Sequence, residues 1–464
     1  MARSLCVWEN SKQVGSWSVD DAGRHSFTYC PEWVANERAR PLSLSLPLQA
    51  EAHEGKVVEN WFENLLPDDP MQRVKLHHRF KTRDYSAFSI LEAAGEDCAG
   101  AVQFFPEGER PACRPVRFLP LTEAEVAKRL REARAEGPLN LDPDEPGCHY
   151  VIAGAQPKIA LFKQGDRWGV TKGETATTHI LKLPIGEIGP QKTDFSHSVD
   201  NEWLCLQLAG EYLSLVPAAR AEIVTFEDER VLALERFDRV FFTKKRKLIR
   251  VPCEDLCQAS GLSPLQKYET EGGPGLGDLM QFFIDARLED VKRYEADGAS
   301  RGEVKRAMRN VPLSAHPLFN AQVLFYLLCA TDGHAKNFSV IHYPSWTGMK
   351  PAPYYDIVSA WPVVGNGPSQ WSYQRLKLAL ALSGKSKHYK IAWMQPRHFI
   401  SSAVAVGVPA ATARQWLEDM IEKTPEVVAR VRDRIPAGFH EQTAEMILAG
   451  VVQQAERLKK GDWG

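Results

Sequence analysis

The stretch "LLCATDGHAKNFSV", Leu327 to Val340, closes an apolar run with an aspartate, a histidine, a lysine and an asparagine within six residues. Taken alone, it is a polar turn at the end of a buried helix. Asn337, however, follows Asp332 by five residues, which is the interval in the catalytic loop pattern H-R-D-x-x-x-x-N. There the aspartate orients an attacking hydroxyl and the asparagine binds a metal ion. The stretch therefore predicts a phosphoryl-transfer site if the chain supplies the remaining parts.

A second acidic position follows at the expected place. In "PYYDIVSA", residues 353 to 360, Asp356 comes after an aromatic pair and lies nineteen residues beyond Asn337. Carboxylate and amide oxygens are ligands that Mg²⁺ prefers. His334 and Lys336 lie in the same polar turn, where contact with nucleotide phosphate and plain solvation are both open. Asp356 and Asn337 are therefore the predicted metal ligands.

Residues 150 to 250 predict short strands around one helix. Strands are expected in "HYVIAGAQPKIALFKQGDRWGV", "THILKLP" and "RVLALERFDRVFF", and a helix in "SHSVDNEWLCLQLAGEYLSL" with Ser198 as N-cap and acidic residues in its first turn. Glu202 shares a helical face with Leu206, Ala209 and Leu213, so its carboxylate points inward and needs a cation. Lys182, twenty residues earlier in a predicted strand, is the candidate partner. The same sequence pattern is also typical of a solvent-exposed lysine on an edge strand, so both interpretations stay open.

The turn "AGAQPK", residues 153 to 158, could direct backbone amides toward phosphate, or it could be an ordinary hairpin. Its position before Lys182 and Glu202 matches the order in which phosphate cradle, lysine and glutamate occur in kinases. A β-rich part followed by a helical part that opens with the Asp332 loop is the outline of such an enzyme.

Composition sets the frame for these motifs. The chain has 464 residues, 44% of them hydrophobic and 25% charged, with a net charge of −2 and a pI near 6.7. A chain of this length is expected to divide into domains, and the charge gives no overall basic footprint for nucleic acid. No apolar run reaches membrane-spanning length, no signal peptide is evident, and nine cysteines without a CxxC pair suit a reducing compartment. We therefore expect a cytoplasmic protein.

Three parts are predicted along the chain: an N-terminal β-rich module over 1–107, a kinase-like N-lobe over 108–254, and a helical C-lobe over 255–464. In the first part, "RPLSLSLPLQ" places leucines 42, 44, 46 and 48 on one face, which predicts a half-buried strand. The proline-rich residues 105 to 120 indicate a linker, and long helical patterns follow residue 255.

The sequence closely resembles the HipA family of serine/threonine kinase toxins of bacterial type II toxin–antitoxin systems, essentially from end to end. The stretches that carry the resemblance are "RPLSLSLPLQ", "NLLPD", "GAQPKIAL", "THILKLPIGEI", "SVDNEWLCLQLA", "ALERFDR", "EDLCQASGL", "KYETEGGPG", "ATDGHAKNFSV" and "YYDIVSAWPV". The resemblance implies an α+β protein with a two-lobed protein-kinase-like fold, an extra small β-rich N-terminal module and an all-helical C-terminal lobe. It also implies ATP and Mg²⁺ as cofactors.

The resemblance assigns roles to particular residues. Asp332 is implied as the catalytic base, Asn337 and Asp356 as metal ligands, and the "ERF" segment as the hinge that meets adenine. The nucleotide-binding residues implied are Ala153, Gly154, Ala155, Gln156, Pro157, Lys158, Lys182, Glu202, Glu235, Arg236, Phe237, His334, Ala335, Lys336, Asn337, Tyr355 and Asp356.

The same resemblance implies the partners. Members of this family phosphorylate a component of translation, typically glutamyl-tRNA synthetase, slow growth and promote persistence, and a small HipB-like helix-turn-helix antitoxin neutralises them and holds them on operator DNA. Contact with DNA is thus expected mainly through the antitoxin. Two alternatives stay open: a catalytically silent module that acts with antitoxin and operator DNA as a corepressor, and a small-molecule phosphotransferase of similar fold.

One position departs from the family pattern. Well-known members carry a serine that they autophosphorylate two residues before the first alanine of "AGAQ", where this chain has Val151. Valine has no hydroxyl, so that route of self-inactivation is closed, and restraint is expected to depend on the antitoxin or on another serine such as Ser196 or Ser198. The surface after "PRHF", basic in some members, reads "ISSAVAVGV", which argues against direct DNA contact there.

Overall fold

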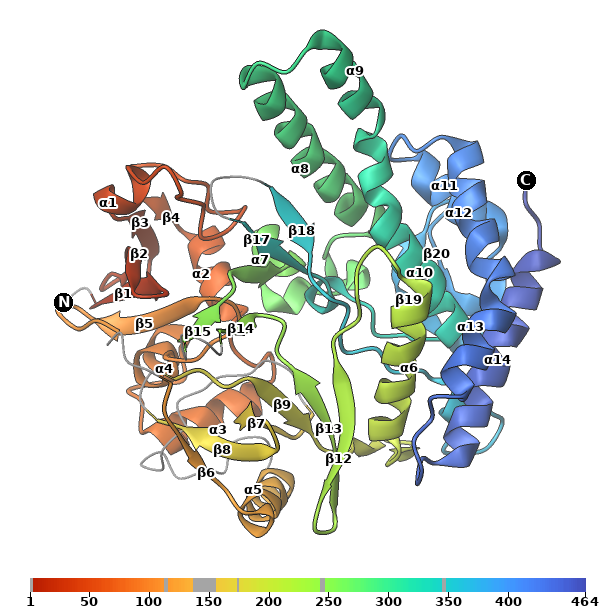
Figure 1. Ribbon diagram of the computed structural model, residues 1–464, viewed down its shortest axis with the longest axis horizontal. Helices are drawn as coiled ribbons and strands as arrows, with labels where there is room; N and C mark the ends of the chain where they lie inside the picture. Colours follow the sequence, from red (N-terminus) through yellow and green to blue (C-terminus); the bar gives the residue numbers. More distant parts are fainter. Residues whose placement is uncertain (1–2, 112–115, 137–155, 173–174, 243–246, 344–347) are drawn as a thin grey trace. The chain divides into compact units, whose positions relative to one another are not determined.

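The computed structural model describes residues 3–111, 116–136, 156–172, 175–242, 247–343 and 348–464 (Figure 1). The chain divides into two compact units. Unit 1 comprises residues 1–184, 220–265 and 339–346, and unit 2 comprises residues 185–219, 266–338 and 347–464. The predicted boundaries near residues 107 and 254 stay a prediction.

The N-terminal part of unit 1 is a five-stranded antiparallel sheet with helices packed against it. Its strand order is β4-β3-β2-β1-β5. The core centres on Trp17 of the second strand, whose ring stacks on Phe62 of the second helix at a centroid distance of 3.9 Å. The elements are β1 (Arg3–Glu9), β2 (Lys12–Val19), β3 (His25–Tyr29), α1 (Pro31–Val34), β4 (His53–Glu54), α2 (Lys56–Glu63), α3 (Pro70–Phe80), α4 (Ala87–Ala94) and β5 (Val102–Pro106).

A second antiparallel sheet of unit 1 has six strands in the order β12-β13-β9-β7-β8-β6. Helix α5 covers it, with Val126 and Leu130 in one apolar cluster with Leu181 and Val231. The strands predicted in this region are confirmed for the described residues, whereas residues 149–155 at the start of the first predicted stretch lie outside them. The elements are β6 (Phe118–Pro120), α5 (Glu123–Glu136), β7 (Lys158–Gln164), β8 (Arg167–Thr171), β9 (His179–Lys182), β12 (Ala221–Phe226) and β13 (Glu229–Glu235).

Short paired segments complete unit 1. Strand β14 (Arg239–Phe242) pairs with β15 (Lys247–Arg250), and β16 (Cys253–Asp255) pairs with β17 (Ser339–His342). Helix α7 (Leu256–Ala259) follows β16 directly and begins with a capping box at Asp255. Strand β17 joins this unit although it comes late in the chain.

The strand predicted in "RPLSLSLPLQ" is wrong. Residues 41–50 form a loop with a turn closed between Ser43 and Leu46, and Leu42 and Leu46 are buried while Leu44 and Leu48 are partly exposed. The alternating pattern failed because Ser43, expected on the solvent face, is fully buried. Its hydroxyl has a specific partner there.

That partner is Glu254 of β16, whose buried carboxylate gathers four donors. It accepts hydrogen bonds from the Ser43 hydroxyl at 2.5 Å, the Leu44 amide at 3.0 Å, the Trp61 indole at 3.1 Å and His342 Nε2 at 2.8 Å. A buried charge is tolerated when its lone pairs are satisfied in this way. The Glu254 carboxylate therefore links the leucine-rich loop, α2 and β17 through hydrogen bonds.

We expect Glu254→Ala to lower the free energy of unfolding by about 3–5 kcal/mol, because it leaves several buried donors without an acceptor. Urea unfolding followed by tryptophan fluorescence measures the change. Glu51→Ala, which removes an exposed carboxylate, is the matched control. Equal stability of the two variants would show that the Glu254 cluster does not stabilise the fold.

Unit 2 is mostly helical. Helices α6, α10, α13 and α14 pack together, and the Tyr212 hydroxyl of α6 donates to Thr424 of α13 at 2.8 Å (Figure 1). The elements are β10 (Gly186–Ile188), β11 (Thr193–Phe195), α6 (Ser198–Tyr212), α8 (Leu276–Ala296), α9 (Arg301–Arg309), α10 (His316–Leu328), β18 (Met349–Pro351), β19 (Lys377–Leu382), β20 (His388–Lys390), α11 (Pro396–Val404), α12 (Ala410–Glu422), α13 (Thr424–Arg432) and α14 (Glu441–Lys459).

Two details of unit 2 differ from expectation. The region after residue 255, expected to be all-helical, also carries the short strands β18 to β20, in addition to β17 of unit 1. Ser198 is the first residue of α6 and not its N-cap, which is His197; the Ser198 hydroxyl instead accepts a hydrogen bond from the Ile185 amide at 2.8 Å. The predicted inward position of Glu202 is confirmed, since the side chain is 1% exposed.

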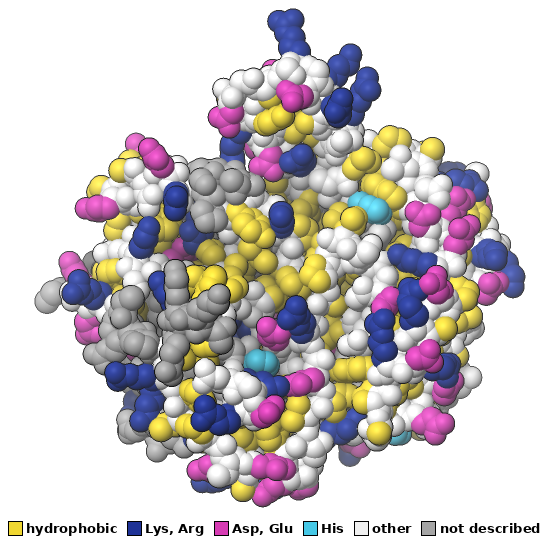
Figure 2. Space-filling model, in the orientation of Figure 1, with side chains coloured by type: hydrophobic (Ala, Val, Ile, Leu, Met, Phe, Trp, Pro, Cys, Tyr) yellow, Lys and Arg dark blue, Asp and Glu magenta, His cyan; other side chains and the backbone are white. Residues whose placement is uncertain are grey.

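The outer surface carries both signs of charge. On the face shown in Figure 2, Lys and Arg side chains are interspersed with Asp and Glu, in keeping with the net charge of −2. Within the described part of the chain, no helix combines the length and apolar character needed to cross a membrane.

Candidate functional site

The Asp332 loop of unit 2 follows α10 directly. The helix ends at Cys329, which takes the left-handed conformation with φ 48°. Gly333 then packs against the ring of Phe325, so closely that a Cβ at this position would lie 2.2 Å from the ring. Because only glycine fits there, the loop turns tightly under the end of the helix, and Asp332 beside it stays exposed.

Hydrogen bonds within the loop fix Asn337 relative to Asp332. The Asn337 amide nitrogen donates to the Asp332 carbonyl at 2.8 Å, and its backbone N–H donates to the His334 carbonyl at 2.9 Å. The side-chain oxygen of Asn337 accepts no hydrogen bond from a described residue. The loop thus supplies one amide oxygen of the kind that Mg²⁺ accepts, and the carboxylate ligand would have to come from Asp356.

Asp356 is held near this loop through its neighbours. It adopts φ 58°, a left-handed conformation that is uncommon outside glycine but best tolerated by Asn and Asp, and its side chain is exposed. The adjacent Tyr355 hydroxyl donates to the Lys336 carbonyl at 2.8 Å. Further along, Ser359 exchanges two hydrogen bonds of 2.8 Å with the Asn201 side chain of α6. Uncommon backbone held by surrounding contacts is typical of functional sites.

His334 lies within electrostatic reach of both the Asp332 and the Asp356 carboxylates. The ring is 6% exposed, and its Nδ1 has no hydrogen-bond partner among the described residues. Burial lowers the pKa of His334 below its ordinary value, while the nearby carboxylates of Asp332 and Asp356 act in the opposite direction. The histidine is therefore neutral at physiological pH, and both acids lie within electrostatic reach of it.

Unit 1, described by itself, contains two buried lysines on neighbouring strands. Lys158 at the start of β7 and Lys182 at the end of β9 are direct cross-strand partners, and they are 6% and 7% exposed. Opposed residues of an antiparallel pair project from the same face of the sheet, so the two lysines lie close together. Gln156 and Pro157 extend this pairing, with the Leu183 amide donating to the Pro157 carbonyl at 3.0 Å. Strand register therefore places two cationic side chains next to each other, and their contact with nucleotide phosphate stays a prediction.

The predicted hinge segment follows β13. Glu235 at its end is exposed and forms an ion pair with Arg220 at 3.5 Å, and Phe237 is partly exposed. The Arg236 side chain is buried and stabilises the fold. Its guanidinium donates hydrogen bonds of 2.8 Å to the Asp238 carboxylate and of 2.8 Å to the Cys98 carbonyl.

The same buried cluster contains Asp97, which bonds Arg239 at 2.8 Å. Burial raises the pKa of Asp97, but Arg236, Arg239 and Arg250 outweigh burial and hold it well below the ordinary value. These arginines therefore serve as counter-ions, and nucleotide contact from Arg236 would have to come from its backbone.

Other predicted positions are placed as follows. Ala153, Gly154, Ala155 and Val151 lie outside the described residues. Ala335 begins a 3₁₀ turn, Ala335–Asn337, and is buried, whereas Lys336 is partly exposed. Glu202 belongs to unit 2 and Lys182 to unit 1, and their pairing stays a prediction.

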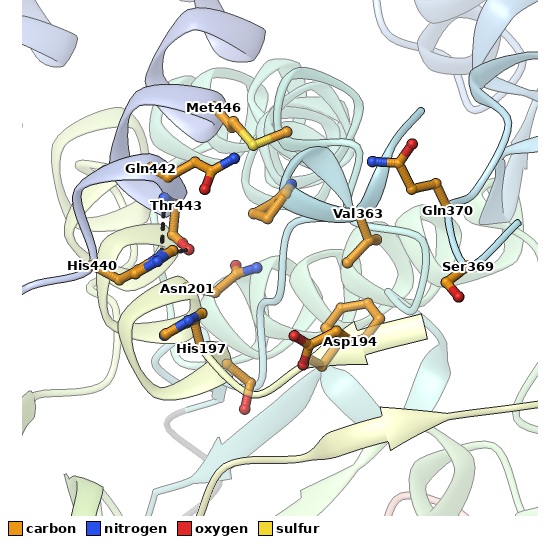
Figure 3. Close-up of a pocket in the computed structure, with 13 residues that line it drawn as sticks. Asp194, His197, Asn201, Val363, Ser369, Gln370, His440, Gln442, Thr443 and Met446 are labelled. Atoms are coloured by element: carbon orange, nitrogen blue, oxygen red, sulfur yellow. Dashed lines mark hydrogen bonds between the residues drawn. The ribbon is translucent and has the colours of Figure 1, made fainter. Parts of the chain in front are cut away.

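A cavity of about 300 Å³ elsewhere in unit 2 bears on the two serines proposed as regulatory sites (Figure 3). His197 and His440, the N-caps of α6 and α14, stack at its wall with a centroid distance of 3.5 Å. Asp194 also lines the cavity, and its carboxylate lies within electrostatic reach of both histidines. Ser198 is 2% exposed and already hydrogen-bonded. Ser196 is exposed next to the cavity, so it is the accessible one of the two.

One residue of the site was missed by sequence reasoning. Tyr268 donates a hydrogen bond of 2.5 Å from its hydroxyl to Oδ1 of Asp332. The tyrosine lies in "KYETEGGPG", a stretch that carried the family resemblance but had no assigned role. Its separation of 64 residues from Asp332 meant that only the fold could bring the two together.

The chain matches two family models. Residues 150–428 match the model of the HipA-like C-terminal domain, and residues 5–105 match that of the HipA N-terminal domain. Together these matches cover most of the chain, including the Asp332 loop and Asp356.

Individual relatives are named as kinases. The chain is 29% identical over 434 residues to Y4mE of Sinorhizobium fredii, whose name carries a provisional kinase assignment, covering 92% of each chain. It is 27% identical over 429 residues to the serine/threonine-protein kinase toxin HipA of Shewanella oneidensis, covering 91% of this chain and 88% of that protein.

A solved structure matches over nearly the full length. It is the Shewanella oneidensis HipA in a complex with HipB and operator DNA, with a TM-score of 0.75, 22% identity, and coverage of 98% of this chain and 97% of that chain. This likeness confirms the expected α+β, kinase-like fold.

Proposed function

The chain belongs to the HipA family, and from this premise we propose that it is an ATP-dependent serine/threonine protein kinase that acts as the toxin of a bacterial type II toxin–antitoxin module. The observation that carries the proposal is the Asp332 loop. Asn337 is folded onto Asp332, and Asp356 lies within electrostatic reach of the same buried histidine. Two acids and an amide in this order are the parts that phosphoryl transfer requires.

Each part has a distinct task in the proposed reaction. Lys158 and Lys182 neutralise nucleotide phosphate, and the end of β13 meets the adenine. Asn337 and Asp356 would hold Mg²⁺, which when bound offsets the charge on the transferring phosphoryl group. Asp332 orients the hydroxyl of the substrate serine or threonine and accepts its proton. Neutral His334 adds no competing positive charge beside Asp332.

The partners are proposed on the same premise. The relative from Shewanella oneidensis was solved with HipB and operator DNA. For this chain we propose neutralisation by a HipB-like antitoxin, contact with operator DNA mainly through that antitoxin, and a translation component such as glutamyl-tRNA synthetase as the phosphorylated target. Phosphorylation of that target would slow growth and favour persistence.

A catalytically silent module is the second candidate. It would bind antitoxin and operator DNA without transferring phosphate. The presence of Lys182, Asp332 and Asp356 favours the kinase, since loss of such residues is what marks inactive kinase-like proteins.

Incubation of the protein with γ-labelled ATP, Mg²⁺ and a bacterial extract tests the proposal. We expect label on a protein of the translation apparatus, on serine or threonine. Label on a metabolite would indicate a small-molecule phosphotransferase, and no label above that of the Asp332→Asn protein would favour the silent module.

The valine at position 151 gives a regulatory prediction. We expect no phosphorylation of residues 151 to 158, none of which is Ser, Thr or Tyr. Val151→Ser should allow it, because a phosphate of charge about −1.5 to −2 in the ATP loop repels nucleotide, and activity should then decline during incubation with ATP and Mg²⁺. Peptide mapping by mass spectrometry follows both forms. Equal rates of inactivation in the two proteins would contradict the prediction.

A further inference from the structure

Tyr268 contacts the acid to which we assign the chemistry. Its hydroxyl donates to Oδ1 of Asp332 at 2.5 Å, and no described residue donates a hydrogen bond to the second carboxylate oxygen, Oδ2. Asp332 is exposed, so without this bond its side chain would be free to change rotamer. One oxygen is thus held by the tyrosine while the other is open to a substrate hydroxyl.

The tyrosine ring is itself held in place. It meets the His334 ring edge to face at a centroid distance of 4.9 Å, and the Lys267 ammonium lies 5.5 Å from its centre. Its carbonyl accepts hydrogen bonds of 3.0 Å from the Glu271 and Gly273 amides. The hydroxyl therefore approaches Asp332 from a fixed direction.

The segment that carries Tyr268 is fastened at both sides. The Ala335 amide of the Asp332 loop donates to the Lys267 carbonyl at 3.1 Å. On the other side, Glu269 accepts from the Ala381 amide of β19 at 2.7 Å and pairs with Lys387 at 2.6 Å. A main-chain hydrogen bond beside Tyr268 therefore ties the segment to the loop that carries Asp332.

Gly273 makes this fastening possible. A Cβ at position 273 would lie 2.0 Å from the Gln266 carbonyl and 2.8 Å from the Tyr268 carbonyl. Only glycine allows the chain to return so closely over itself. Gly273 therefore allows the tight turn that positions the Tyr268 hydroxyl.

We propose that Tyr268 is a positioning residue for the phosphoryl transfer, which holds the Asp332 carboxylate in the rotamer that directs Oδ2 at the substrate hydroxyl. The inference rests on the proposed kinase function. Tyr268 takes no part in nucleotide binding and transfers no proton; its hydroxyl acts only through Asp332.

The test compares Tyr268→Phe with the wild type in steady-state phosphorylation assays. The ring and its contacts remain, so the protein should fold, and a thermal unfolding midpoint verifies this. We expect kcat to fall on the order of 10-fold to 100-fold, as for small misplacements of a catalytic group, while the KM and Kd for ATP stay unchanged. Tyr85→Phe, which removes an exposed tyrosine hydroxyl on unit 1, is the matched control and should retain full activity.

A double-mutant cycle separates positioning from a general structural effect. On the residual rate of Asp332→Asn, adding Tyr268→Phe should cost less than twofold, because two residues that act through one group are not additive. An equal fold-loss in both backgrounds would overturn the inference, as would a Tyr268→Phe protein with the activity of Tyr85→Phe. If the wild type itself transfers no phosphate, or Asp332→Asn is fully active, the proposed function fails and this inference with it.

Discussion

Asp332→Asn and Asp356→Asn are each expected to reduce phosphoryl transfer to a small residual rate and to abolish growth inhibition while leaving the fold intact. The rate should fall by at least about 10²–10³-fold, the effect of losing one group that stabilises or aligns the transition state. Asparagine has nearly the same shape as aspartate and also tolerates the left-handed conformation of Asp356. The substitutions therefore remove charge without adding backbone strain.

Growth of cells that express each variant, together with transfer of label from ATP, measures the effect. Asp433→Asn, at an exposed aspartate after α13, is the matched control and should behave like the wild type. If a folded Asp332→Asn or Asp356→Asn protein transfers no phosphate but still arrests growth, the toxin acts by binding, and the silent-module alternative gains the support that the kinase loses.

Lys182→Ala is expected to lose nucleotide affinity and rate together. The substitution removes a point charge from the phosphates, and it leaves Lys158 as the remaining cation of the cross-strand pair. We also expect it to deprive the buried Glu202 of its predicted partner, which costs stability as well as activity.

The measurement is ATP affinity by calorimetry beside the rate of phosphorylation. Lys163→Ala is the matched control. Lys163 lies on β7 five residues beyond Lys158, on the opposite face of the sheet, and pairs with Glu222. An unchanged Kd for ATP in Lys182→Ala would remove this lysine from the nucleotide site.

Sequence reasoning succeeded where the signal was local. Asp332 and Asn337 are only five residues apart, and in the structure the Asn337 side chain donates a hydrogen bond to the Asp332 carbonyl. The strands β7, β9 and β13 and helix α6 were found because periodicity is a property of consecutive residues. The inward face of α6 that buries Glu202 followed from the same helical spacing.

It failed where a distant partner overrode the local pattern. Alternating leucines predicted a strand at residues 42 to 48, but a buried glutamate more than 200 residues away takes the Ser43 hydroxyl and the Leu44 amide. Ser198 looked like an N-cap, yet its hydroxyl is bound by the Ile185 amide. The contact predicted between Arg236 and the nucleotide stays a prediction for its backbone, because its side chain lies in a buried cluster with Asp97 and Asp238.

The sequence by itself determined the family, the kinase-like fold and the order of the candidate catalytic residues, because each is written in short motifs whose members are close along the chain. Only the tertiary structure decided which side chains face one another. Lys158 met Lys182 through strand register, and Tyr268 met Asp332 through a hydrogen bond across 64 residues. Contacts of this kind depend on how the chain returns to itself, and no pattern of neighbouring residues encodes that.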